Sequence, residues 1–93
     1  MSVAEELRER LERALQPTLL DIVDESASHH GHAGWREGGE THFRVHIVSS
    51  RFDGLNRIDR QRLVHGAAAE LLRARIHALS IKALTPKEAL KTG

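Results

Sequence analysis

Three histidines within four residues carry the clearest potential for chemistry in this sequence. His29, His30 and His32 lie in a glycine-rich stretch over residues 26–39, in a chain with seven histidines and no cysteine. Imidazole titrates near neutral pH and is the commonest metal ligand of proteins. The cluster therefore indicates a metal-binding loop, with solvated polar histidines as the alternative. The lack of thiols excludes a self-contained zinc or iron–sulfur site built on cysteine.

His77 has the most informative position among the other histidines. Its neighbours Ile76, Ala78 and Leu79 are apolar or small, so the ring must find a partner or reach the edge of a sheet. A partly buried histidine hydrogen-bonded to a backbone carbonyl is the structural alternative to a ligand role at this position. The remaining three are expected to be exposed or hydrogen-bonded: His42, His46 and His65.

The elements that must position these residues follow from the hydrophobic pattern. Apolar residues at helical spacing, behind a serine–glutamate capping box, predict a helix over about residues 3–15. A short, partly β-branched segment predicts a strand over about residues 18–24. Strict alternation of apolar and polar residues predicts a second strand over about residues 41–49, with one hydrophobic and one basic face.

The second half of the chain continues this arrangement. A broad apolar stripe predicts a second helix over about residues 57–74, and an apolar segment predicts a third strand over about residues 76–83. A second capping box, with proline at the first helical position, begins a short helix over about residues 86–91. The predicted order is α-β-β-α-β-α in a single domain over residues 1–93.

Composition and charge exclude several classes of protein. No apolar run reaches the length of a membrane span, and the first residues lack a secretion-signal pattern, so a cytoplasmic protein without membrane association is expected. No nucleophile elbow, P-loop or dinucleotide fingerprint is present, so no enzyme activity is expected. Net charge is −4 over residues 1–25 and +5 over residues 26–93, which permits an acidic or nucleic-acid partner without arguing for one.

Several segments, taken in their order and spacing, resemble the BolA family. No single one is diagnostic, but together they cover roughly residues 5–90. The segments are Asp24-Glu25-Ser26, Glu40-Thr41-His42-Phe43-Arg44-Val45, Ile47-Val48-Ser49 followed by Phe52-x-Gly54, Arg60-Gln61-Arg62-Leu63-Val64, and Ile76-His77-Ala78-Leu79 followed by Thr85-Pro86.

The resemblance implies a KH-like α/β (α+β) fold, with a three-stranded sheet covered on one face by helices. It also implies a monomer that pairs with a monothiol glutaredoxin and shares with it a [2Fe–2S] cluster, whose sulfur ligands come from a glutaredoxin cysteine and glutathione. The family's ligand positions correspond to His77 and to the loop histidines, with His32 and His29 as equal candidates and His30 as their neighbour. A cysteine-free chain suits half of such a site, because two imidazoles can replace two thiolates on one iron.

Two other functions are compatible with the sequence. Arg57, Arg60 and Arg62 at the start of the second helix, with Lys82, are candidates for contacts to a partner protein or to DNA, so a DNA-binding transcriptional regulator is the alternative. Many BolA-like proteins have Arg-His-Arg where this chain has Arg-Gln-Arg, and the turn before the helix lacks the GXXG clamp of RNA-binding KH domains. A loop that simply binds zinc, nickel or copper is a third reading.

Overall fold

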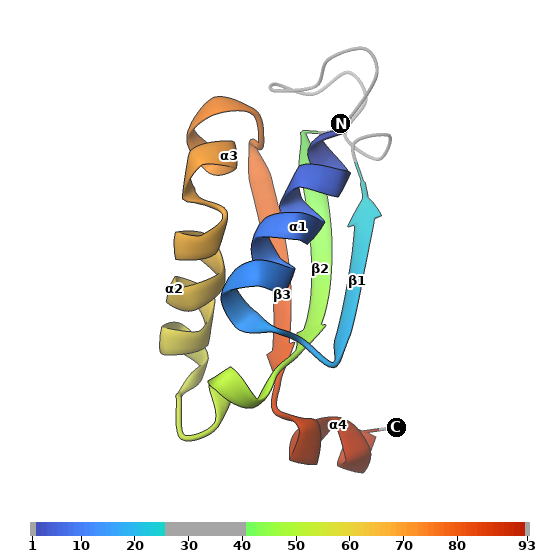
Figure 1. Cartoon of the computed structure of the whole chain (residues 1–93), viewed down its shortest axis with the longest axis vertical. Coiled ribbons are helices and arrows are strands. Elements are labelled where there is room, and N and C mark those ends of the chain that lie inside the picture. Colours follow the sequence, from blue (N-terminus) through green and yellow to red (C-terminus); the bar gives the residue numbers. More distant parts are fainter. Residues whose placement is uncertain (1, 26–40, 93) are drawn as a thin grey trace.

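Three strands form one mixed sheet, in the spatial order β1-β2-β3 (Figure 1). The computed structural model describes residues 2–25 and 41–92. The predicted α+β class and the order of the main elements are confirmed. The elements are α1 (Val3–Leu15), β1 (Leu19–Asp24), β2 (His42–Val48), the 3-10 turn η2 (Ser50–Phe52), α2 (Arg57–Ala67), α3 (Ala69–Ala74), β3 (Ala78–Leu84) and α4 (Pro86–Thr92).

The pairing of the strands brings distant parts of the sequence to one edge of the sheet. β1 runs antiparallel to β2, with Asp24 opposite Phe43. β2 and β3 are parallel, with His42 opposite Ala78. β1 therefore ends where β2 and β3 begin, at the edge that lies uppermost in Figure 1. We call this end of the sheet, where β1 terminates and β2 and β3 start, the upper edge. We define it by Glu25, Thr41 and His77.

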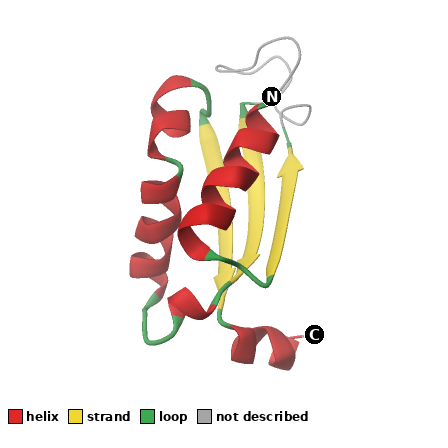
Figure 2. Ribbon diagram, in the orientation of Figure 1, coloured by secondary structure: helices red, strands yellow, loops and turns green. Residues whose placement is uncertain are grey.

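Helices α1 and α2 cover one face of the sheet (Figure 2). Each buried aliphatic or aromatic side chain contributes on the order of 2 kcal/mol, so this layer supplies most of the stabilising free energy. Arg44 of β2 and Ser80 and Lys82 of β3 alternate with the core positions and are exposed on the other face. The core joins α1 to β2 and α2 through Val3, Leu7, Leu11, Leu15, Phe43, Val45, Ile47 and Val64.

The second helix and the third strand differ from the sequence-based expectation. A single residue, Ala68, with φ −103° and ψ 12°, separates α2 from α3. Its amide still donates to the Val64 carbonyl at 3.1 Å, and Gly66, a weak helix former, precedes it. β3 begins at Ala78 rather than at residue 76, because the side chain of Ile76 is buried in the core as the chain leaves α3.

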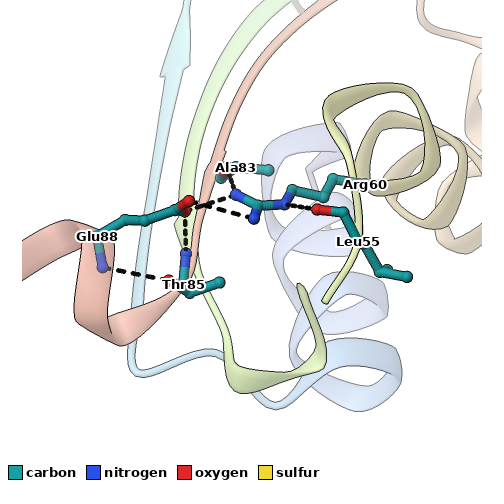
Figure 3. A network of polar contacts seen from close by, with 5 residues as sticks. All are labelled: Leu55, Arg60, Ala83, Thr85 and Glu88. Carbon is teal, nitrogen blue, oxygen red and sulfur yellow. Dashed lines mark hydrogen bonds and ion pairs between the residues drawn. The ribbon is translucent and has the colours of Figure 1, made fainter. Parts of the chain in front are cut away.

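Arg60 and Glu88 join the start of α2 to the start of α4 (Figure 3). The guanidinium donates to both Glu88 carboxylate oxygens, at 2.6 and 3.2 Å, and to the carbonyls of Ala83 and Leu55 at 3.1 and 2.9 Å. Glu88 also accepts from the Thr85 amide at 2.9 Å and its own amide donates to the Thr85 hydroxyl oxygen at 3.1 Å, which confirms the second predicted capping box. The Arg60 side chain is only 14% exposed, so this pair is structural.

Because of the Arg60–Glu88 ion pair, we expect the folded protein to lose stability in acid. The hydrogen bond from Arg60, followed by that from the Thr85 amide, lowers the pKa of Glu88 from 4.5 to about 2. Because the folded pKa lies below the unfolded one, the contribution is complete above pH 4.5 and is lost as pH falls toward about 2. Urea denaturation from pH 6 to pH 2 measures it as a falling midpoint.

Matched variants isolate this contribution. Glu88→Gln should flatten part of the acid slope, and the remainder includes Glu5, whose pKa is lowered by hydrogen bonds from Ser2. Glu12→Gln, a change of the same chemistry on the exposed side of α1, should leave the slope unchanged. Identical slopes for wild type and Glu88→Gln would contradict the assignment.

Candidate ligand site at the upper edge of the sheet

His77 lies immediately before β3, at the upper edge, with its side chain exposed. Its amide donates to the Thr41 carbonyl at 2.7 Å, and the side chain of Ile76 before it is buried in the core. The backbone at this position is therefore anchored on both sides while the imidazole faces outward. The sequence offered a partly buried histidine as the alternative to a ligand at this position. His77 is exposed, so that alternative does not describe it.

His42 lies beside His77, which the sequence-based reasoning did not anticipate. The two ring centroids are 6.1 Å apart and the ring planes differ by 14°. His42 is only 8% exposed, and its Nδ1 lies 2.8 Å from the hydroxyl oxygen of the fully buried Thr41. The sequence predicted that His42 is either exposed or hydrogen-bonded. The structure shows the second alternative, a buried ring in contact with the Thr41 hydroxyl. The parallel register of β2 and β3 is what brings the two rings together.

The three clustered histidines, His29, His30 and His32, lie outside the described residues. The chain leaves the upper edge at Glu25, whose amide donates to the His42 carbonyl at 2.7 Å, and it returns at Thr41. The segment that carries these histidines is therefore attached at both ends to the edge that carries His77.

The other two histidines lie elsewhere. His65 is exposed near the end of α2, as expected. His46 is half-buried on β2, and its Nε2 is buried with no hydrogen-bond partner among residues 2–25 and 41–92, contrary to the expectation for it. Neither lies at the upper edge with His77: His65 is near the end of α2, and His46 is opposite Asp21 in the middle of the sheet.

The donor set fits half of a [2Fe–2S] site and no more. Such a cluster takes four ligands, usually thiolates, and this chain has no cysteine. Within the two described ranges, no group of three or more histidine or carboxylate side chains is placed to hold a metal ion. An exposed imidazole at an edge, beside the attachment points of a histidine-rich segment, suits a site that a second molecule completes.

The predicted basic residues lie apart from His77: Arg57, Arg60 and Arg62 are on α2, and Lys82 is opposite His46 in the sheet. α2 begins at the lower end in Figure 1, away from His77. Arg57 and Lys82 are exposed and line a hollow of about 460 Å³ together with Arg60 and Glu88. Arg62 is exposed and lies 3.6 Å from Asp59. The structure therefore does not bring the basic residues and the candidate ligands together, and it places Arg60 in the ion pair with Glu88.

No helix in the part of the chain that the structure describes has both the length and the apolar character needed to cross a membrane.

The fold places this chain among small α+β proteins with a three-stranded mixed sheet. The family model described as BolA-like protein matches residues 11–88. The chain belongs to the BolA family.

Curated relatives and solved structures agree with this membership. BolA-like protein 1 from Homo sapiens is 49% identical over 82 residues, which cover 88% of this chain and 57% of that protein. The chain thus spans less than two thirds of that relative. The DNA-binding transcriptional regulator BolA from Escherichia coli is 40% identical over 88 residues, covering 95% of this chain and 80% of that protein. The BolA domain of SufE1 from Arabidopsis thaliana superposes with a TM-score of 0.85 at 41% identity, over 95% of this chain and 96% of that one.

Proposed function

We propose that this chain pairs with a monothiol glutaredoxin and contributes histidine ligands to a [2Fe–2S] cluster that the two proteins share. The role is iron–sulfur cluster trafficking or iron and redox regulation. The observation that carries the proposal is the exposed imidazole of His77 at the edge where the segment with His29 and His32 is attached, in a chain without cysteine. The family membership supports it.

The ligand roles follow from the donor set. His77 supplies one imidazole and either His29 or His32 supplies the second, while a glutaredoxin cysteine and glutathione supply the sulfur. The cluster, when bound, supplies one-electron chemistry. The imidazole of His77 faces outward on a backbone that is already anchored. Less conformational entropy is therefore lost when this side chain binds.

Mixing the free chain with a cluster-loaded monothiol glutaredoxin tests the proposal. The free chain should be colourless, because it has no thiolate that could hold an iron–sulfur chromophore. Addition to the glutaredoxin should produce a heterodimer on size exclusion and an altered visible circular dichroism spectrum. An unchanged spectrum with no complex would refute the proposal. Zinc, nickel or copper binding without that visible iron–sulfur spectrum would instead support the metal-binding loop.

DNA binding is the second candidate, and one observation favours it. Arg57 and Lys82 flank the hollow at the start of α2, where they are exposed and able to meet phosphates. One relative carries the name of a DNA-binding transcriptional regulator. Fluorescence anisotropy with duplex DNA separates the candidates, since DNA binding weakens with salt, and Arg57→Ala should lower the salt slope by about one.

The proposal includes a cytoplasmic location, a reducing compartment in which a chain without disulfides is at no disadvantage. Relatives named as chloroplastic, or as chloroplastic and mitochondrial, belong to the same family. Imaging of the tagged full-length protein tests the location.

A further inference from the structure

We propose that His42 is a positioning residue for His77: its fixed ring lies alongside the exposed ring and restricts the orientations that the His77 imidazole adopts. The purpose of this arrangement rests on the proposed function, since a ligand held in place binds at a lower entropic cost. The geometry itself is a property of the free chain.

The two rings are close enough to interact directly. Their centroids are 6.1 Å apart and their planes are nearly parallel, at 14°. Aromatic rings attract one another in offset arrangements at centroid distances of roughly 4.5–7 Å. The His77 ring therefore has a preferred place beside His42, although its side chain is exposed.

His42 is held far more firmly than His77. It is 8% exposed, and its Nδ1 lies 2.8 Å from the Thr41 hydroxyl oxygen. Its carbonyl accepts from the Glu25 amide at 2.7 Å, and its backbone is paired with Ala78 in the sheet. The His42 ring is therefore a fixed surface beside which the exposed His77 ring lies.

Thr41 couples the two histidines through one residue. Its hydroxyl contacts the His42 ring, while its carbonyl accepts from the amides of His77 at 2.7 Å and Ala78 at 3.2 Å. The threonine is fully buried, so it fixes the His42 ring and the His77 backbone relative to each other. Displacement of the His42 ring would leave the His77 backbone in place and release only its side chain.

Nuclear magnetic resonance of the free chain tests the proposal without any cluster. Wild type should show a dominant His77 side-chain rotamer and a nuclear Overhauser effect between the two rings. His42→Ala should average the rotamers, whereas His42→Phe, which keeps a ring, should retain the dominant one. His65→Ala, at an exposed position of α2, is the control and should match wild type. Rotamer averaging in wild type, or an unchanged rotamer in His42→Ala, would overturn the proposal.

The glutaredoxin complex supplies a second, separate readout. His42→Ala should still form the complex with the wild-type spectrum but lose its cluster about three- to tenfold faster, as expected when one side chain is no longer ordered in advance. His42→Phe should be close to wild type. Loss of the spectrum in both folded variants would overturn the positioning role and make His42 a ligand. Failure of wild type to form any complex would count against the proposed function, while the rotamer measurement would still decide the role of His42.

Discussion

His77→Ala is expected to abolish the mixed-ligand spectrum of the cluster shared with glutaredoxin. The imidazole at this position is exposed on a backbone anchored by Thr41 and Ile76, whereas the neighbouring His42 ring is only 8% exposed. Among the described residues at the upper edge, His77 is therefore the histidine that a partner can reach most readily. Visible circular dichroism of the glutaredoxin mixture measures the loss.

Loop variants provide the comparison for this prediction. His29→Ala or His32→Ala alone should give a weaker and more labile cluster, because a neighbouring imidazole can substitute, and only the double variant should match His77→Ala. Far-ultraviolet circular dichroism should show that all four variants remain folded. If His77→Ala keeps the spectrum and the cluster lifetime of wild type, the assignment of iron to His77 is wrong.

Arg60→Ala is expected to destabilise the fold by about 2–3 kcal/mol and to lower the melting temperature by roughly 10 °C. The substitution removes four hydrogen bonds from a side chain that is 14% exposed. It leaves the carbonyls of Leu55 and Ala83 and the carboxylate of Glu88 without this donor. Arg60→Lys should have a stability between those of wild type and Arg60→Ala, since lysine keeps the charge but loses the planar guanidinium.

Arg62→Ala is the matched control for Arg60. Its side chain is 78% exposed and lies 3.6 Å from Asp59 within the same helix, so its loss should change the free energy of unfolding by less than about 0.5 kcal/mol. Equal effects of the two substitutions in urea denaturation would contradict the structural role of Arg60. The contrast also makes Arg57 and Arg62, rather than Arg60, the residues with which to test contacts to DNA or to a partner.

Local signals in the sequence were sufficient for most of the fold. The helical spacing of apolar residues and the capping box at Ser2 predict α1 with its observed bounds, Val3–Leu15. The alternation of apolar and polar residues predicts β2 within one residue at each end. The break at Ala68 has only a weak signal in the sequence, the preceding Gly66. In the structure, the hydrogen bond from the Ala68 amide to the Val64 carbonyl is still made.

The parts of the site that escaped prediction depend on contacts between distant residues. Arg60 has the composition of a surface cation, and only the fold shows that its partner, Glu88, lies 28 positions further along the chain. His42 and His77 are 35 positions apart in the sequence, and their contact follows from the parallel register of two strand starts. Alternation along one strand indicates which side chains share a face. It excludes a register shift of one residue but does not choose between registers that differ by two.

Pulsed electron paramagnetic resonance of the reduced complex tests the central claim most directly. The chain is labelled with ¹⁵N-histidine, mixed with unlabelled cluster-loaded glutaredoxin and reduced by one electron. Histidine ligation predicts a strong ¹⁵N hyperfine coupling that is present in wild type and in His65→Ala and absent in His77→Ala. A wild-type spectrum without ¹⁵N coupling would show that this chain does not ligate the cluster through histidine, and would contradict the account.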